Sequence, residues 1–437
     1  MSEFKVAPAN ASAGVKLMTW VDNRFPATKL WKDHASEYYA PKNFNFWYFF
    51  GILATLVLVI QIVTGIFLVM HYKPDAGLAF ASVEYIMRDV PWGWLIRYMH
   101  STGASAFFVV VYLHMYRGLI YGSYRKPREL VWIFGCAIFL CLMGEAFMGY
   151  LLPWGQMSYW GAQVIVNLFS AIPVIGEDLA VWIRGDYTVS DITLNRFFAF
   201  HVIALPLVLV GLVAAHLMAL HETGSNNPDG VEIKKQPKDP VTGLPLDGIY
   251  SHPYYTVKDI VGVIVFLVVF SIVVFFLPEM GGYFIEANNF IPADPLKTPE
   301  HIAPVWYFTP YYAMLRAVPS FMGTQVWGVI IMGVSVMIFF AMPWLDRGAV
   351  KSIRYRGGLY KAWLAAFVVA FLILGYLGVV PVTVWGQFAE GFPFYAADKA
   401  TVVARVLTVV YFLFFLLMPW YTARDRTKPQ PSRVTWK

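Results

Sequence analysis

The sequence has little charge for its length. Only 14% of its 437 residues are charged, whereas 58% are hydrophobic and 18% are aromatic. A soluble domain carries about 25% charged residues, so this composition excludes a soluble globular protein and indicates a chain that crosses a membrane several times. The net charge of +6 does not by itself indicate a nucleic-acid partner, because membrane proteins carry basic residues in their loops for topology.

Cysteine is nearly absent. Cys136 and Cys141 are the only two, and both lie inside an apolar run, so we expect them to be core residues. No CxxCH run for covalent haem attachment occurs, and two cysteines are too few for an iron–sulfur cluster. Any such centre would have to lie on a partner. The first 42 residues also lack a short apolar run, so we expect no cleaved signal peptide.

Long hydrophobic runs are abundant. A transmembrane helix needs about 20 mostly apolar residues. We predict an all-α, polytopic membrane protein with eight transmembrane helices: 44–70, 93–116, 130–152, 194–220, 258–278, 322–344, 360–381 and 402–421. Residues 157–172 are too few to span, and we expect a hairpin of interfacial helices there. The predicted divisions are an arm (1–43), a four-helix bundle (44–223), a linker (224–257) and a second half (258–437).

Basic residues are concentrated in alternate connections between the predicted helices. If the N-terminus is cytoplasmic, five segments hold 24 of the 33 lysines and arginines, counting helix-end residues with the nearer side. These segments are the N-terminal arm, the connections after the second, fourth and sixth helices, and the C-terminal tail. The other side holds nine. Because loops rich in lysine and arginine stay in the cytoplasm, we predict that both termini are cytoplasmic.

Two predicted helices each carry a pair of histidines. His100 and His114 are fourteen residues apart, and His201 and His216 are fifteen apart. Fourteen residues bring an α-helical side chain back to within roughly 40° of its starting direction, about 21 Å along the axis. Both helices run from the outside inwards in the predicted topology, so His100 matches His201 in depth and His114 matches His216. The helices can thus form two stacked bis-imidazole sites.

A single buried histidine is more often hydrogen-bonded inside a bundle than bound to a metal, but four in two depth-matched pairs favour metal sites. Neutral imidazole is the usual axial ligand of haem iron. Two imidazoles on one iron leave no position for oxygen or substrate, so such a haem only transfers electrons. Two haems about 21 Å apart would cover most of a hydrocarbon core roughly 30 Å thick.

Glycines and arginines fit this interpretation. Gly51 and Gly65 in the first helix are fourteen residues apart, as are Gly135 and Gly149 in the third. Small residues let helices, or a flat macrocycle, approach closely. The alternative is that these glycines serve only the packing of helices. Some arginines near the two depths could bind haem propionates or be interfacial cations: Arg97, Arg117 and Arg196.

Six runs resemble one family: QIVTGIF from Gln61, RYMH from Arg97, YGSYR from Tyr121, FMGYLLPWGQMS from Phe147, NRFF from Asn195 and HETGSNNP from His221. Together they show a close resemblance, over roughly residues 30 to 425, to cytochrome b of the quinol:cytochrome c oxidoreductase, respiratory Complex III, in its bacterial form. The resemblance implies a di-haem four-helix bundle, four further helices and a place in the bacterial inner membrane.

The resemblance also implies a Q cycle. Ubiquinol is oxidised on the outer face, and one electron goes through the Rieske iron–sulfur protein and a cytochrome c1-type subunit to cytochrome c. The other passes through an outer, low-potential b haem, held by His100 and His201. It continues to an inner, high-potential b haem, held by His114 and His216, and reduces a quinone on the inner face. The cycle builds a proton gradient. The resemblance further implies a homodimeric complex and no nucleic-acid partner.

Two quinone pockets are implied by position. The outer pocket would draw on Phe147, Tyr150, Gly155, Gly161, Pro304, Val305, Trp306 and Tyr307. The inner pocket would draw on His221, Ser225, Lys258 and Asp259. A reduced quinone that takes up protons needs donors such as His221 and Asp259 on the inner side. Read singly, His221 could instead be a cation at a helix C-terminus and Asp259 a charge at a helix N-terminus.

The second histidine pair departs from the family. Its spacing of fifteen residues, as in the photosynthetic relatives, overshoots by roughly 60°. Pro206 lies between the two histidines and must interrupt the helical hydrogen bonding. We expect a kink or bulge to absorb the extra residue, and a continuous, unkinked α-helix from His201 to His216 would contradict this.

The outer-pocket motif departs as well. The family's Pro-Glu-Trp-Tyr reads Pro-Val-Trp-Tyr at residues 304–307, so the glutamate that would take a quinol proton is absent. Glu145 lies near the outer end of the third helix, where relatives carry a small residue. A carboxyl group at membrane depth is costly and by default functional. We predict that Glu145 replaces the missing glutamate, with an ion pair to a basic group as the alternative. Its rivals are Glu279, Glu286 and Glu300. The other candidate catalytic residues are Tyr307, His221 and Asp259.

Two other classes of protein fit less well. A transporter with proton-carrying histidines predicts internal repeats and discontinuous helices, and no repeat relates the two halves. A membrane di-iron desaturase needs histidines clustered at short spacing on the cytoplasmic face, whereas only His216 and His221 are close together.

Overall fold

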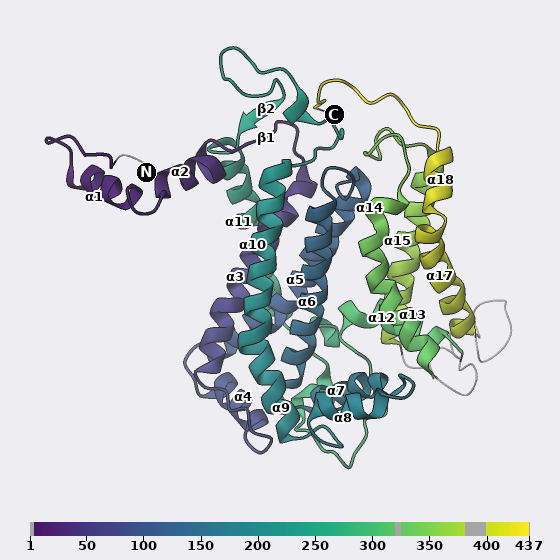
Figure 1. Ribbon diagram of the computed structural model, residues 1–437. Coiled ribbons are helices and arrows are strands. Elements are labelled where there is room, and N and C mark those ends of the chain that lie inside the picture. Colours follow the sequence, from purple (N-terminus) through teal and green to yellow (C-terminus); the bar gives the residue numbers. More distant parts are fainter. Residues whose placement is uncertain (1–3, 320–324, 381–398, 437) are drawn as a thin grey trace.

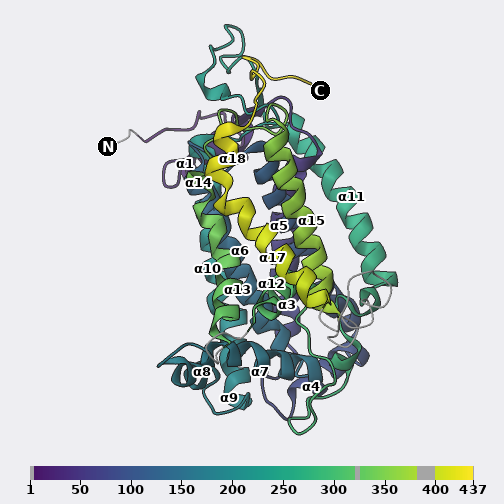
Figure 2. The same ribbon diagram turned by 90° about the vertical axis from the view of Figure 1, so that its right-hand side faces the viewer.

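The computed structural model describes residues 4–319, 325–380 and 399–436. Figure 1 shows two groups of long helices side by side, one from the first half of the chain and one from its C-terminal part. Figure 2, turned by 90°, shows that α15 and α17 run along the length of the first group. The prediction of an all-α, polytopic fold is confirmed by these long apolar helices.

Among the described residues, seven helical segments are long and apolar enough to cross a membrane: Phe46–Val69, Gly93–Tyr121, Glu129–Leu151, Asp191–Thr223, Tyr254–Phe276, Val326–Leu345 and Gly358–Val379. The bent pair Ala400–Leu416 and Met418–Arg424, with 60° between its parts, makes an eighth if it counts as one span. The predicted number of spans agrees with this result. The predicted start of the sixth span at 322 and the end of the seventh at 381 lie outside the described residues.

The spans are built from these elements in chain order: η2 (Phe46–Tyr48), α3 (Phe49–Val69), α5 (Gly93–Tyr121), α6 (Glu129–Leu151), α9 (Asp191–Ala199), η3 (Phe200–Ala204), α10 (Leu205–Thr223), α11 (Tyr254–Phe276), α13 (Val326–Met337), η8 (Ile338–Ala341), α14 (Met342–Leu345), α15 (Gly358–Val379), α17 (Lys399–Leu416) and α18 (Met418–Arg424).

Shorter elements lie between and before the spans: α1 (Ala13–Asp22), α2 (Ala27–Trp31), η1 (Lys32–Ser36), β1 (Tyr39–Pro41), α4 (Ala79–Arg88), α7 (Gln156–Ser170), α8 (Gly176–Arg184), η4 (Ile233–Lys235), β2 (Gly248–Tyr250), η5 (Met280–Gly282), η6 (Ala287–Phe290), η7 (Trp306–Phe308) and α12 (Thr309–Ala317). A helical hairpin does lie between the third and fourth spans, where α7 and α8 pack on each other. It is longer than expected, because residues 157–172 form mostly the single helix α7, and α8 lies beyond the predicted range. The short helix α12 and the antiparallel β1–β2 pair were not predicted.

The fourth span contains the irregularity that its histidine spacing predicted. Its α-helical hydrogen bonding is interrupted by η3, a π-helical turn that includes His201 and ends two residues before Pro206. A π turn holds one more residue than an α turn and often occurs at functional sites. It therefore absorbs the fifteenth residue, and the expectation of a bulge is confirmed.

Five segments that the charge count placed on one side meet at one end of the molecule, which we call the basic face. Asp229, after the fourth span, accepts hydrogen bonds from Arg354, after the sixth span, at 3.0 Å and from the backbone N–H of Thr435, in the C-terminal tail, at 2.6 Å. Arg128, after the second span, pairs with Glu232 at 2.8 Å. The N-terminal arm joins them because β1 pairs with β2. The other end, which carries α4, α7 and α8, is the opposite face (Figure 1).

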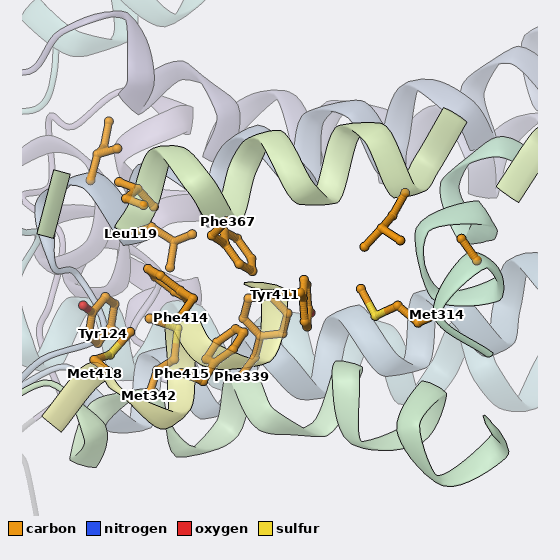
Figure 3. Packing of buried hydrophobic residues seen from close by; sticks show 14 of the residues in the cluster. Leu119, Tyr124, Met314, Phe339, Met342, Phe367, Tyr411, Phe414, Phe415 and Met418 are labelled. Atoms are coloured by element: carbon orange, nitrogen blue, oxygen red, sulfur yellow. The ribbon is translucent and has the colours of Figure 1, made fainter. Parts of the chain in front are cut away.

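A buried aromatic cluster holds the C-terminal helices together (Figure 3). Phe367 of α15 stacks on Phe414 of α17 with 4.5 Å between ring centres, and Tyr411 donates a hydrogen bond to the carbonyl of Ser335 in α13. Cys136 of α6 belongs to the same cluster, as expected for a core residue. The packing joins α12, α13, α15 and α17 to the first group of helices.

Candidate functional site

The four histidines form two facing pairs. The ring centres of His100 and His201 are 6.2 Å apart, and those of His114 and His216 are 6.3 Å apart. Imidazole nitrogens bind a transition metal at about 2.0–2.1 Å, and the ring centre lies about 1.1 Å behind the nitrogen. Two imidazoles on opposite sides of one ion would therefore place their ring centres about 6.3 Å apart. Each pair has the separation that a bis-imidazole site needs.

A glycine from a neighbouring helix backs each of these rings. Each glycine and the histidine that it contacts lie on helices that pack side by side, α3 with α5 and α6 with α10. An added Cβ would lie 3.3 Å from His100 at Gly65, 3.4 Å from His114 at Gly51, 3.4 Å from His216 at Gly135 and 2.4 Å from His201 at Gly149. The absence of a side chain at these positions lets each imidazole lie against a helix backbone, which fits a flat macrocycle held between the rings.

Hydrogen bonds leave one nitrogen of His100 available for a metal. The Thr64 hydroxyl lies 2.9 Å from Nδ1 of His100 and donates its own proton to the carbonyl of Ile60 at 2.6 Å. It therefore accepts from Nδ1–H, and the lone pair remains on Nε2. Gln61 holds the same helix turn by donating to the His100 carbonyl at 3.0 Å. Such partners orient metal-binding histidines.

His201 is oriented by Glu145 of α6. Its Nδ1 lies 2.9 Å from the Glu145 carbonyl oxygen and 3.0 Å from the carboxylate oxygen Oε1. Both partners accept from Nδ1–H, so here too the lone pair remains on Nε2. The side chain of Glu145 thus contacts a basic group, as in the alternative interpretation of this residue.

The three candidate arginines differ in position. Arg97 lines a cavity together with His100 and His201. Arg117 lies with Nη2 3.5 Å from Nε2 of His114. Arg196 is exposed and donates to the carbonyl of Trp182 in α8, so it is turned towards the interfacial hairpin.

A cavity of about 350 Å³ extends from the His100–His201 pair towards the loop that carries the Pro-Val-Trp-Tyr motif. Its volume lies in the range of small-molecule sites, about 300–1,000 Å³. Three of the predicted outer-pocket residues line it: Tyr150, Val305 and Tyr307. Glu145 lines it as well. A single cavity therefore adjoins both the histidine pair and the motif.

The motif is held firmly against the first group of helices. Tyr307 stacks on Phe108 of α5 with 3.9 Å between ring centres and 6° between planes, and its carbonyl accepts from the Tyr112 hydroxyl at 2.6 Å. Trp306 donates through Nε1 to the Ser105 hydroxyl at 3.1 Å. Pro304 precedes this segment. These contacts join residues about 200 positions apart in the sequence, and the motif segment forms one wall of the cavity.

The other predicted outer-pocket residues lie around this wall. Gly161 of α7 backs the Tyr150 ring, since an added Cβ would lie 3.6 Å from it. Gly155 permits close approach of the loop at Asn289, where an added Cβ would meet the side-chain oxygen at 2.3 Å. Phe147 packs against Phe197 of α9 with 5.4 Å between ring centres.

The rival acids differ in burial. Glu279 and Glu300 are exposed, whereas Glu286 is half-buried. Glu286 accepts a hydrogen bond from the Tyr150 hydroxyl at 2.5 Å. Burial raises the pKa of Glu286 to about 6, although the Tyr150 hydrogen bond lowers it. This carboxyl group therefore lies directly behind a residue that lines the cavity.

The predicted inner-pocket residues lie at the basic face in two groups. His221, near the end of α10, stacks on Tyr38 with 4.4 Å between ring centres, and the Ser225 carbonyl accepts from Arg128. Nζ of Lys258, in α11, lies 4.5 Å from the centre of the Tyr254 ring.

Asp259 is half-buried in the same turn of α11 as Lys258. The N-terminal arm connects the two groups, because Tyr38 contacts His221 while the Pro41 carbonyl accepts from Tyr255 at 2.5 Å. The arm that precedes the first span thus contacts both groups of predicted inner-pocket residues.

Two residues at these sites were missed from the sequence. Thr64 directly precedes Gly65, and its contact with His100 could have been expected from a polar side chain on the turn that faces the histidine. Tyr38 lies in an arm with no helical periodicity, so no pattern in the sequence indicated its contact with His221.

Comparison with known proteins gives matches along most of the chain. Residues 35–224 match a family model described as cytochrome b/b6/petB, and residues 292–392 match one described as cytochrome b(C-terminal)/b6/petD. A cytochrome b from Allochromatium vinosum is 62% identical over 420 residues, covering 96% of this chain and 98% of that protein. One from Rhodospirillum rubrum is 45% identical, covering 96% of each.

A fusion protein and a solved structure extend the comparison. A protein named cytochrome b/c1 from Bradyrhizobium diazoefficiens is 42% identical, covering 98% of this chain and 58% of that protein. A structure described as hyperthermophilic respiratory Complex III matches with a TM-score of 0.81 and 36% identity, covering 93% of this chain and 98% of the matched one. The sequence relatives and the structural match therefore indicate the same family of proteins.

Proposed function

The chain belongs to the cytochrome b/b6 family, whose name implies haem b, and from this premise we propose that it carries out a Q cycle as the membrane subunit of a ubiquinol–cytochrome c reductase. It would oxidise ubiquinol at the opposite face and reduce a quinone at the basic face. The observation that carries the proposal is the pair of facing imidazoles at each of two depths, 6.2 and 6.3 Å between ring centres.

We assign one b-type haem to each histidine pair. His100 and His201 would hold the outer, low-potential haem, and His114 and His216 the inner, high-potential one. Held by these histidine pairs, the two haems would supply single-electron transfer across the membrane. The bare glycine surfaces support the assignment at both pairs, and the Nδ1 hydrogen bonds of His100 and His201 support it at the outer pair. Arg97 and Arg117 would balance propionate charge at the two depths.

The outer quinol pocket is assigned to the cavity beside the His100–His201 pair. Tyr307 and Val305 form one wall, and their segment is fixed by contacts to α5. A rigid wall orients a bound ring and excludes water from the side that faces the histidines. The predicted acceptors of a quinol proton at this cavity are Glu145, which lines it next to His201, and its rival Glu286, which hydrogen-bonds the lining residue Tyr150.

The inner quinone pocket is assigned to the basic face. His221 and Asp259 would donate the protons that a reduced quinone takes up, and Ser225 and Lys258 would orient its oxygens. Their connection through the N-terminal arm supports a shared pocket.

The basic face would be cytoplasmic, with both termini on that side of a bacterial inner membrane. The excess of lysine and arginine at this face supports the orientation. The partners would be the Rieske iron–sulfur protein, a cytochrome c1-type subunit and a second copy of the complex. The cytochrome b/c1 fusion among the relatives supports the c1-type partner.

A redox titration of the purified complex, combined with a quinol:cytochrome c assay, tests the proposal. We expect two b-haem components and electron transfer that is blocked by strobilurin-type and antimycin-type inhibitors. The variant His201→Leu should lose one component. The matched control, His301→Leu, should keep both, because this histidine donates to the carbonyl of Val379 and lies outside the two pairs. A complex with no b-haem bands would overturn the proposal.

A further inference from the structure

Glu286 is a carboxyl group placed behind the wall of the outer cavity. It directly precedes η6, in the loop between α11 and α12. Its Oε2 accepts a hydrogen bond from the hydroxyl of Tyr150 in α6, which lies 136 positions earlier in the chain, at 2.5 Å. Glu279 and Glu300 of the same loop are exposed. Glu286 is therefore the one of these three glutamates that the fold connects to the cavity.

Tyr150 connects the cavity with Glu286. Its side chain lines the cavity, whereas its hydroxyl donates to the carboxylate. Its position is fixed from two sides: its carbonyl accepts from the Ser158 hydroxyl at 2.6 Å, and Gly161 backs its ring. The hydroxyl can accept a proton from a ligand in the cavity while it donates its own to Glu286.

Val305 lines the same cavity. A glutamate at this position would face a bound quinol directly, whereas the valine side chain that stands there cannot accept a proton. Glu145 also lines the cavity, but its Oε1 lies 3.0 Å from Nδ1 of His201. Its carboxylate is thus directed towards the histidine pair, whereas the Tyr150–Glu286 pair leads towards the opposite face.

We propose that Tyr150 and Glu286 form a two-step proton relay that carries a quinol proton out of the cavity in place of the missing motif glutamate. The inference rests on the proposed quinol oxidation at this cavity. The quinol O–H bond breaks as a new O–H bond forms on the Tyr150 oxygen. The former hydroxyl proton of Tyr150 passes to the Glu286 carboxylate. The electrons follow the routes of the Q cycle, and Glu286, being half-buried, releases its proton to the outer solvent.

The protonation behaviour of Glu286 suits this role. Burial raises its pKa to about 6, so the carboxylate is ionised at neutral pH and remains a stronger base than an ordinary glutamate. The titratable groups that face it among the described residues are Tyr150, through the hydrogen bond, and Tyr307, whose pKa it helps to raise. Quinol oxidation should therefore fall as the pH drops through about 6, because protonated Glu286 cannot accept from Tyr150.

The decisive variants are Glu286→Gln and Tyr150→Phe in the whole complex. The amide oxygen introduced by Glu286→Gln would still accept the Tyr150 hydrogen bond, so the fold should be kept, but the amide cannot take the proton. A positioned base contributes about 10²–10⁴-fold to proton transfer, and we expect quinol:cytochrome c turnover to fall at least tenfold in each. The inflection near pH 6 should disappear in Glu286→Gln. The matched control, Glu300→Gln, removes an exposed carboxylate of the same loop and should leave turnover unchanged.

A second substitution tests whether the relay replaces the motif glutamate. Val305→Glu, added to Glu286→Gln or to Tyr150→Phe, should restore turnover, because the new carboxylate faces the cavity without an intermediary. Loss of turnover in Glu286→Gln that Val305→Glu does not restore would overturn the relay, as would wild-type turnover in Glu286→Gln. A loss confined to Glu145→Gln would assign the proton to Glu145 instead.

Two readouts separate the relay from the proposed function. In both relay variants, the b-haem spectrum and the antimycin-sensitive reduction of the inner haem by quinol should match those of the wild type, because the basic face is untouched. If the wild-type complex itself lacks strobilurin-sensitive quinol oxidation, the proposed function fails and the relay fails with it.

Discussion

The substitution Gly149→Ala should remove one haem selectively. Gly149 of α6 lies closest to its histidine among the four glycines, since an added Cβ would lie 2.4 Å from Cε1 of His201 and 2.8 Å from Nδ1. Carbon atoms in contact lie about 3.5–4.0 Å apart. The ring would therefore have to move by about 1.1–1.6 Å.

That displacement exceeds what a metal–imidazole bond tolerates. Such a bond is about 2.0–2.1 Å long and is kept to within about 0.2 Å. At Gly51, Gly65 and Gly135, by contrast, the added Cβ would lie 3.3–3.4 Å from the ring. A shift of about 0.1–0.2 Å brings this contact to the lower limit of about 3.5 Å, whereas Gly149 needs about 1.1 Å to reach the same limit. The same substitution should thus be tolerated at three positions and should break the iron–His201 bond at the fourth.

The assay is the haem content per chain by pyridine haemochrome, together with a redox titration. In Gly149→Ala we expect one haem in place of two and loss of the low-potential component. Gly144→Ala in the same helix is the matched control, because its Cβ would make an ordinary contact of 3.6 Å with Leu205. Two haems with wild-type potentials in Gly149→Ala would refute the assignment of His201 as a ligand.

Three further results are expected. His114→Leu should remove the high-potential haem and keep the low-potential one, as seen in the reduced-minus-oxidised spectrum. Asp346→Ala leaves the buried guanidinium of Arg356 without its carboxylate, a change that costs about 3–5 kcal/mol. The thermal midpoint of the complex should therefore fall, and an unchanged midpoint would contradict the structural role of this pair. Tyr38→Leu removes the ring that stacks on His221. It should slow antimycin-sensitive quinone reduction without changing haem content, and equal rates would exclude the arm from the inner pocket.

The spans and the grouping of their connections were predictable because their signals are local in the sequence. Apolar runs of membrane length predicted the spans to within a few residues at most ends, such as 93 for α5 and 130 for α6. Loop charge predicted which connections share an end, and the contacts of Asp229 place three of those segments together. The extra residue and Pro206 predicted a bulge, which the structure forms as the π turn η3.

The histidine pairing was also predictable, because a helical period combined with the direction of each span fixes depth. His100 faces His201 and His114 faces His216, as expected from the topology. The glycines with the same period lie on the neighbouring helices, each against one of these rings. Their assignment as a haem site still rests on the proposed function.

The sequence by itself determined the class of the chain, its spans and the depths of its histidines, because hydropathy, helical period and loop charge act along neighbouring residues. Only the tertiary structure decided which acid meets which group. Glu145 and Glu286 are both glutamates near the cavity beside the His100–His201 pair, yet one contacts His201 and the other Tyr150. The contact of Glu286 with Tyr150 joins residues 136 positions apart, through an irregular loop whose path depends on the packing of α7 and the motif wall, and no periodic signal in the sequence encodes such a path.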